Sequence, residues 1–225
     1  MTLDRNRKLS LIERAFLATI NGLGDLVTGY TIAFGEELVR QHGLRGFFKW
    51  AGVTQKTFDE ICAHFGVEDA HLMASLASFW NGCDYCAYGH MLAHNLYVFE
   101  RTGELFPVDE EDVVSLMRMR DSEVMGELRS RLGKAAAYAR KLELVERKNH
   151  LRLEEGPADG PDDKMLLKCI ALYEWVNECS IVAGAPAPPL GVIAKKKALH
   201  QRYLEARAPE RASRPRPVAA APKVT

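Results

Sequence analysis

Hydrophobic residues recur at helical spacing along most of this chain. Between residues 9 and 22 they fall three or four positions apart, which predicts an amphipathic helix. A break containing two glycines at 21–24 separates this helix from a second one predicted over 26–40. The same reasoning predicts further helices over residues 57–65, 68–80, 83–101, 108–117, 122–132, 134–148, 163–183 and 195–206. We find no segment that alternates as a strand does, so the sequence predicts an all-α fold, a multi-helix bundle.

Composition divides the chain into four parts. We expect residues 1–53 to form an N-terminal helical segment that packs on a core domain over residues 54–192. A basic helix is predicted over residues 193–207. Residues 208–225 are rich in Pro, Ala and Arg without periodicity, which predicts a disordered tail. The chemistry of the chain is therefore expected in the core domain.

The charge balance excludes two broad classes of partner. The 225 residues are 47% hydrophobic and 27% charged, with a formal net charge of +0. We therefore expect neither nucleic acid nor an anionic membrane as a partner. The N-terminal residues are charged and lack the apolar core of a signal peptide, and no apolar run approaches the ~18 residues of a membrane helix. We expect a cytoplasmic protein, in which paired cysteines are more often catalytic or metal-binding than structural.

The stretch over residues 80–90 carries the densest chemistry. Cys83 and Cys86 lie three positions apart, and His90 follows four positions later. Since an α-helix turns ~100° per residue, these three residues and His94 share an arc of ~80° on one helix face. The opposite face carries an apolar stripe of Tyr88, Leu92, Leu96 and Phe99. We expect the apolar face to pack and the other to present thiols and imidazoles to a pocket.

This arrangement suits redox chemistry. Cys83 and Cys86 follow an Asn-Gly break, so they lie in the first turns of a helix, where unpaired amides and the helix dipole favour a thiolate. His90, one turn beyond Cys86, can act as a base or hydrogen-bond partner. Two cysteines at this spacing can close a disulfide after one of them is oxidised, and an external dithiol can then reduce it.

Two other interpretations of these residues are open. Zinc accepts a ligand set of two cysteines and two histidines, but Cys83 and His94 lie ~16 Å apart along one helix, which cannot wrap an ion tetrahedrally. Alternatively, both cysteines are core residues and the histidine is a cap. For the other cysteines, Cys62, Cys169 and Cys179, we expect buried, inert positions.

The run from Asn81 to His90 closely resembles the CxxCxxxH signature of the AhpD-like, carboxymuconolactone decarboxylase-related family. The segment ALYEWVN over residues 171–177 is also similar to the frame of that family, and the resemblance covers roughly residues 54–186. It implies an all-α domain that assembles into trimers or hexamers. It also implies a thiol-dependent peroxidase or disulfide reductase. Lactone decarboxylases of the family usually lack the paired cysteines, so the pair favours the redox branch.

The resemblance also implies roles for individual residues. Cys86 is the peroxidatic thiol, Cys83 the resolving thiol and His90 part of a proton relay. Twelve positions before Cys83, where the resembling peroxidases carry a glutamate, this chain has His71. His71 can also shuttle protons, or it can mark a member with altered peroxidase activity.

Our leading hypothesis is a homo-oligomeric thiol oxidoreductase that reduces hydroperoxides or disulfides through Cys83 and Cys86. It needs no bound cofactor and no metal, and a dithiol electron-donor protein is its expected partner. One rival is a non-catalytic helical oligomer in which the cysteine pair is vestigial. Another is a cofactor-free decarboxylase-like enzyme that uses His90 or His71 as its base.

Overall fold

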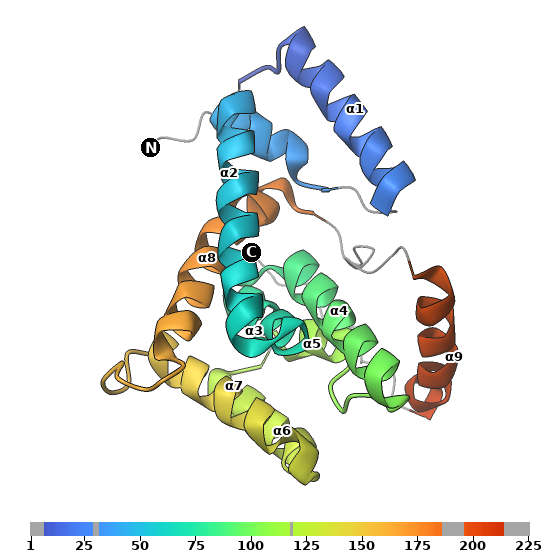
Figure 1. The fold of residues 1–225 in the computed structure, drawn as a ribbon, viewed down its shortest axis with the longest axis vertical. Coiled ribbons are helices and arrows are strands. Elements are labelled where there is room, and N and C mark those ends of the chain that lie inside the picture. Colours follow the sequence, from blue (N-terminus) through green and yellow to red (C-terminus); the bar gives the residue numbers. More distant parts are fainter. Residues whose placement is uncertain (1–6, 29–31, 118, 186–195, 214–225) are drawn as a thin grey trace, which may run out of the picture.

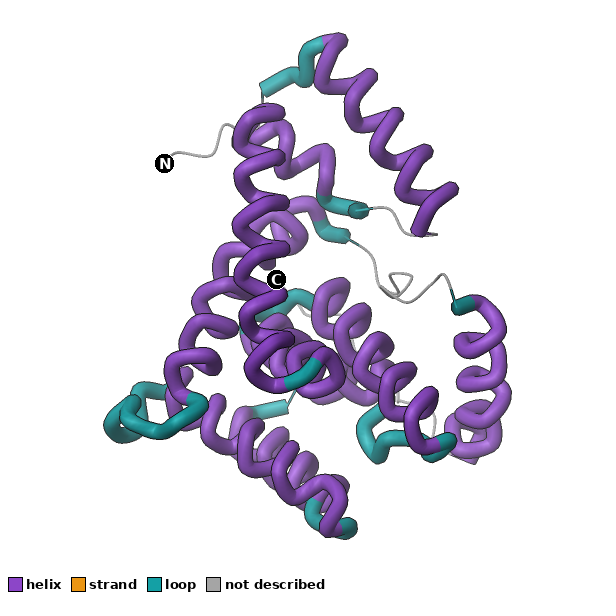
Figure 2. Tube along the Cα trace, viewed as in Figure 1, coloured by secondary structure: helices purple, strands orange, loops and turns teal. Residues whose placement is uncertain are grey.

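The structure is a computed structural model that describes residues 7–28, 32–117, 119–185 and 196–213. Within these ranges the chain forms nine α-helices and one short 3-10 helix, with no strand, which confirms the predicted all-α class (Figure 2). The helices are α1 (Leu11–Thr28), α2 (Gly35–Phe65), α3 (Val67–Trp80), α4 (Asp84–Thr102), α5 (Glu110–Leu116), α6 (Asp121–Leu132), α7 (Ala139–Arg152), α8 (Asp163–Ala183) and α9 (Lys197–Ser213).

Helices α3 and α4 form an antiparallel hairpin at the centre of the molecule (Figure 1). Every residue of α3 from Ala70 to Phe79 is buried, because small and apolar side chains cover its whole circumference. Helices α2, α7 and α8 pack around α3, and α8 also reaches α4. The hairpin therefore places Cys83, at the end of the α3–α4 turn, and Cys86, in the first turn of α4, against α8.

The far side of α4 is covered by α9, beside it in Figure 1 and away from α8. The predicted apolar stripe of α4 forms a second hydrophobic cluster with α9. Its buried members are Leu92, Ala93, Leu96, Phe99 and Tyr203, and the partly buried Tyr88, Tyr97, Leu105, Leu199 and Leu204 pack against them. The expected packing of this face is confirmed. Both sides of α4 are thus enclosed by protein.

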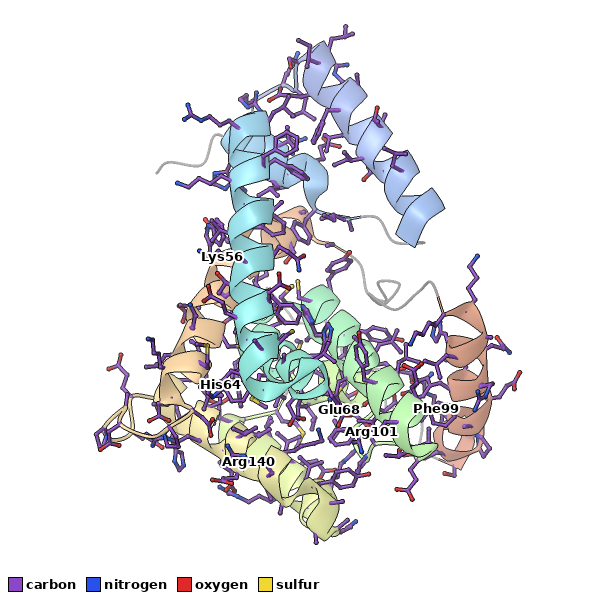
Figure 3. All side chains as sticks on the ribbon, in the orientation of Figure 1. Lys56, His64, Glu68, Phe99, Arg101 and Arg140 are labelled. Carbon is purple, nitrogen blue, oxygen red and sulfur yellow. The ribbon has the colours of Figure 1, made fainter. Side chains whose placement is uncertain are left out.

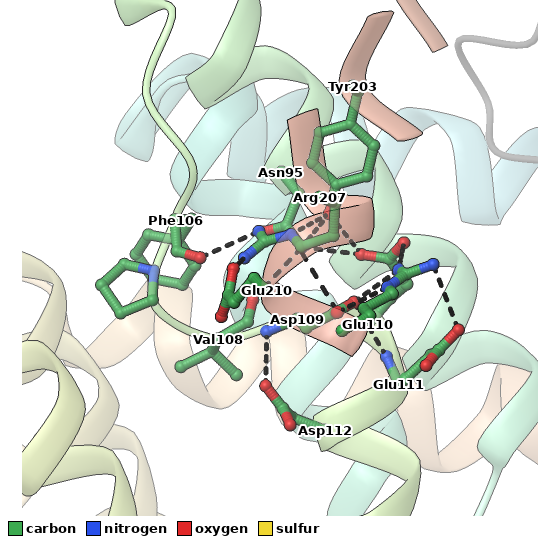
Figure 4. A network of polar contacts seen from close by, with 12 residues as sticks. Asn95, Phe106, Val108, Asp109, Glu110, Glu111, Asp112, Tyr203, Arg207 and Glu210 are labelled. Carbon is green, nitrogen blue, oxygen red and sulfur yellow. Dashed lines mark hydrogen bonds and ion pairs between the residues drawn. The ribbon is translucent and has the colours of Figure 1, made fainter. Parts of the chain in front are cut away.

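A buried polar network fixes the end of α9 to the start of α5 (Figure 4). Asp109 and Glu110 are fully buried and both pair with Arg211 of α9. The Tyr203 hydroxyl donates to the Glu110 carboxylate at 2.6 Å, and Arg207 donates to the Phe106 carbonyl at 2.9 Å. These contacts hold α9 in place beyond what its apolar face provides.

Four sequence predictions differ from the structure. The helix predicted over 26–40 does not form as one element, because residues 26–28 belong to α1, residues 29–31 lie outside the described residues and α2 begins at Gly35. The break predicted at 21–24 is wrong, because α1 continues through it to Thr28. The predicted boundary between residues 53 and 54 falls inside α2, which bends at Gly43 (φ 67°) and continues to Phe65. The predicted disordered tail is wrong for residues 208–213, which belong to α9 and include Pro209. The rest of that tail, 214–225, lies outside the described residues.

Along the part of the chain that the structure describes, no helix is both long and apolar enough to cross a membrane.

Candidate active site

The turn between α3 and α4 places Cys83 immediately before α4. Gly82 has a φ of 78°, a left-handed conformation that glycine adopts without strain. The Cys83 amide donates to the Ser78 carbonyl at 2.9 Å, which closes the turn. Cys83 is the N-cap of α4, and its sulfur accepts a hydrogen bond from the Cys86 amide at 3.4 Å. A sulfur there meets the positive end of the helix, which favours the thiolate.

The two thiols form one cluster with Ser180 of α8. The Ser180 Oγ lies 2.9 Å from the Cys83 sulfur and 3.5 Å from the Cys86 sulfur. The Cys86 thiol and the Ser180 hydroxyl, by hydrogen bonding to Cys83, hold the pKa of Cys83 below its ordinary value. The same bond to Cys83, together with burial, raises the pKa of Cys86 well above its ordinary value. The cluster therefore holds one proton on Cys86 and favours negative charge on Cys83.

A hollow of about 220 Å³ lies beside Cys83, a residue that is itself only 2% exposed. Its lining consists of Gly82, Cys83, Asp84, Ser180, Ile181, Gly184 and Ala185. Cys86 does not line it. Among the described residues of the lining, Asp84 is the charged one. A substrate that occupies this hollow lies next to Cys83.

Three aromatic residues from three helices form a second polar chain. His90 of α4 is 2.8 Å from His71 of α3, between their Nδ1 atoms, and the His90 Nε2 is 2.9 Å from the Tyr173 hydroxyl of α8. Burial lowers the pKa of His71 to about 4. Burial, and then the neighbouring His71, lower the pKa of His90 well below its ordinary value. Both imidazoles are therefore neutral near pH 7.

The neutral chain has two proton arrangements. In one, Tyr173 donates to His90, and His90 donates to His71 through Nδ1. In the other, His71 donates to His90, and His90 donates to Tyr173. Moving one proton across each of the two bonds of the first arrangement gives a tyrosinate and a protonated His71. Reaching the second, neutral arrangement also requires a proton to enter at the Tyr173 hydroxyl and one to leave from the His71 Nε2, so the chain passes a proton only when its two ends exchange protons with their surroundings.

The structure brings the candidate residues together in two pairs and leaves the pairs separate. Cys83 contacts Cys86, and His71 contacts His90. The expected hydrogen bond between a thiol and His90 is not formed, because His71 and Tyr173 occupy both ring nitrogens of His90. His90 nevertheless lies one helical turn from Cys86, where side chains four residues apart are neighbours.

His94 does not share the pocket that the helical spacing predicts. It is completely buried, its Nδ1 lies 2.8 Å from the Glu68 carbonyl, and its ring packs edge-on against Phe106. Burial lowers the pKa of His94 to about 3. The prediction is wrong because a helical wheel cannot distinguish a face that lines a pocket from one enclosed by neighbouring helices.

One group of side chains has the composition of a metal site. Glu68, Asp69 and His94 can each place a ligand atom within 4.8 Å of the others. Lys141 pairs with both carboxylates, however, and Arg101 donates two hydrogen bonds to Glu68 (Figure 3). The lysine ammonium already supplies the charge that a cation would bring. This group therefore fits an ion-pair network better than a metal centre.

The remaining cysteines have the inert character expected of them. Cys169 and Cys179 are buried in α8, and Cys62 is partly buried in α2. Burial raises the pKa of Cys62 to about 11 and that of Cys179 to about 12. They stay protonated at neutral pH, which separates them from Cys83.

Sequence reasoning did not identify Ser180 or Tyr173 as site residues. Tyr173, Asn177 and Ser180 follow one another at helical spacing on α8, and all three are buried. A polar stripe on an otherwise apolar helix was the available signal, because buried polar groups require partners. The partners are Ser78 of α3 for Asn177, His90 of α4 for Tyr173, and the cysteine pair at the start of α4 for Ser180, and they could not be read from α8 alone.

Comparison of the chain with protein-family models, with curated proteins and with solved structures finds no match. The fold and the site therefore describe the protein by its class: within the described residues it is all-helical, and it carries two cysteines, three positions apart, at the N-terminus of a helix.

Proposed function

We propose that this protein is a thiol–disulfide oxidoreductase of the AhpD-like type, which works through reversible formation of a Cys83–Cys86 disulfide. The observation that carries the proposal is the unequal environment of the two thiols. Cys83 accepts hydrogen bonds and lines a hollow, whereas Cys86 donates a hydrogen bond to Cys83 and is not part of the lining of the hollow. Such asymmetry gives one nucleophile and one resolving thiol.

The reaction follows from this asymmetry. The Cys83 thiolate attacks one sulfur of a disulfide substrate, forms a mixed disulfide and expels the other substrate sulfur as a thiolate. Cys86 passes its proton to that leaving thiolate and attacks the Cys83 sulfur. The internal disulfide forms and the second substrate sulfur leaves. Two electrons have passed to the substrate, and an external dithiol returns them to the protein.

The arrangement favours roles opposite to those that the resemblance implies for the two cysteines. The resemblance makes Cys86 the attacking thiol, but in the reduced state Cys86 holds the proton and has no place in the hollow. Cys83 has the lower pKa, lies at the helix N-terminus and lines the hollow. We therefore assign the first attack to Cys83 and resolution to Cys86.

Hydroperoxides are the second candidate substrates, as the cysteine pair also fits their chemistry. Cys83 would take one peroxide oxygen as a sulfenic acid and release an alcohol, and Cys86 would then close the disulfide and release water. A departing alkoxide is more basic than a thiolate and needs a positive or proton-donating neighbour. The described lining of the hollow has Asp84 as its charged residue, so a disulfide is the better substrate.

The remaining proposals concern partners and the rival activities. We retain a dithiol protein as the electron donor and a homo-oligomer as the working state, both from the resemblance. The decarboxylase alternative needs His71 or His90 as a base. Burial has lowered the pKa of each, which makes both of them weak bases.

Single-turnover oxidation tests the proposed function. The reduced protein is mixed with excess glutathione disulfide, and the glutathione released and the cysteine pairing are measured by mass spectrometry. We expect two glutathione molecules per chain and a Cys83–Cys86 disulfide. A matched control, Cys62→Ser, should behave like the parent because Cys62 lies outside the cluster. A parent protein that forms no internal disulfide with glutathione disulfide or with hydroperoxide would overturn the proposal.

A further inference from the structure

A single hydroxyl on α8 lies between both thiols and a backbone carbonyl. The Ser180 Oγ is 2.9 Å from the Cys83 sulfur, 3.5 Å from the Cys86 sulfur and 3.0 Å from the Asn177 carbonyl. Ser180 is 2% exposed, so water does not compete freely for it. A serine hydroxyl has one proton to donate and two lone pairs with which to accept. Only one of the three neighbours can receive that proton at a time.

We propose that Ser180 is a proton switch, which donates to Cys83 while Cys83 is a thiolate and returns to the Asn177 carbonyl when the disulfide forms. The proposal deepens the proposed function and rests on it, because the switch acts during the Cys83–Cys86 redox cycle.

The reduced state requires the first position of the switch. A buried thiolate needs donors, and Cys83 has three within reach: the Cys86 thiol, the Cys86 amide and the Ser180 hydroxyl. Hydrogen bonds to a charged acceptor are stronger than those between neutral groups. The Ser180 proton is therefore drawn from the Asn177 carbonyl to the Cys83 sulfur.

The oxidised state requires the second position. Neither sulfur of a disulfide carries charge, and sulfur is then a weak acceptor. The Asn177 carbonyl is the stronger acceptor and regains the proton. Ser180 consequently stabilises the reduced thiolate more than the disulfide, and it shifts the redox equilibrium towards the reduced protein.

The charged groups around Cys83 do not stabilise its thiolate, so a donor from α8 has to contribute. The titratable groups that act on Cys83 are Cys86 and Asp84, and both belong to α4. The Asp84 carboxylate raises the pKa of Cys83, so it opposes the thiolate. Across the hollow, α8 contributes Ser180 together with the uncharged Ile181. The Ser180 hydroxyl is thus the donor that α8 supplies to the nucleophile.

The first measurement is the pH dependence of alkylation at Cys83, followed by peptide mass spectrometry. In Ser180→Ala we expect the midpoint to rise by about one pH unit, because a hydrogen bond to a charged group is lost. Below the midpoint this makes alkylation about tenfold slower. Ser180→Thr keeps the hydroxyl and should restore the parent midpoint. Ser75→Ala is the matched control: Ser75 is equally buried, but its hydroxyl donates to the Ala87 carbonyl and not to sulfur.

The second measurement is the equilibrium constant with the glutathione couple. In Ser180→Ala the disulfide should be favoured about tenfold more than in the parent, which is a reduction potential about 30 mV lower for this two-electron couple. The difference should vanish below both midpoints, grow with pH through the parent midpoint and level off above the variant midpoint. A merely structural role of Ser180 would not produce this pH dependence.

The two failures are distinguishable. A pair that glutathione disulfide cannot oxidise overturns the redox function and the switch together. An oxidisable pair whose Cys83 midpoint is the same in Ser180→Ala, Ser75→Ala and the parent overturns the switch alone. If Ser180→Ala does not fold, Ser180→Gly, which also removes the hydroxyl, is used in both measurements instead.

Discussion

Arg207 is the most deeply buried cation in the contact between α9 and the rest of the bundle. Its side chain is completely enclosed, and its guanidinium donates to the Phe106 carbonyl at 2.9 Å and to Glu210 at 2.6 Å (Figure 4). It also lies 4.0 Å from Asp109, a buried carboxylate. The perturbation we consider is Arg207→Met, which keeps an unbranched stem and removes the charge and the donors.

The loss of docking free energy of α9 follows from the buried groups that lose a partner in Arg207→Met. Asp109 and Glu110 are fully buried, and Arg211 becomes the main cation that compensates them. The Phe106 carbonyl loses its donor from α9. Removing one partner of a buried ion pair costs about 3–5 kcal/mol, because the remaining charge is left without compensation. We therefore expect the docking of α9 to weaken by at least a hundredfold, since each ~1.4 kcal/mol is tenfold.

Amide hydrogen exchange can locate this loss. The amides of α9 in Arg207→Met should exchange at least a hundredfold faster than in the parent, whereas those of the central helix α3 should change far less, because α9 can detach while the core stays folded. Arg202→Met is the control on the same helix, since Arg202 is exposed and only approaches the Phe99 ring, at 6.0 Å. Equal exchange rates in the two variants would refute the reasoning about the buried network.

Two further predictions concern buried titratable groups. Burial lowers the pKa of Lys148 from 10.5 to about 8; between these values the unfolded chain binds a proton that the folded protein has released, so stability should rise with pH. Lys148→Met should remove this rise. Between pH 8 and 10.5, the difference in unfolding free energy between parent and variant, measured by urea titration, should change by about 3 kcal/mol. A difference that stays constant over this pH range would contradict the prediction. His71→Glu places a carboxylate beside His90, which should raise the pKa of His90 in an NMR titration and increase hydroperoxide turnover. If the His90 pKa rises but the rate does not, position 71 does not limit that reaction.

The start of α4 was predictable because its signals are local. An Asn-Gly break, a residue with an acceptor side chain at the N-cap and an apolar stripe all lie within a few residues of Cys83. The contact between His71 and His90 is different in kind. It depends on how α3 folds back on α4, so the sequence indicated the two residues without indicating that they touch.

The end of α9 shows why composition alone misled. Pro and Arg residues near position 208 indicate disorder when they lack partners. Here Arg211 reaches Asp109 and Glu110, residues about a hundred positions earlier, and these ion pairs support the helix beyond Pro209. The glycines near position 22 led to a wrong prediction of a helix break. Glycine disfavours a helix by only about 1 kcal/mol, and neighbouring residues can compensate for this.

The order in which the two thiols react is the central claim, and trapping tests it directly. Cys86→Ser and Cys83→Ser are each mixed with glutathione disulfide near neutral pH, and the adduct at the remaining cysteine is followed by mass spectrometry. We predict that Cys86→Ser accumulates a stable mixed disulfide on Cys83, and that Cys86 in Cys83→Ser reacts at least tenfold more slowly. Faster adduct formation on Cys86 than on Cys83 would contradict the assignment of Cys83 as the attacking thiol.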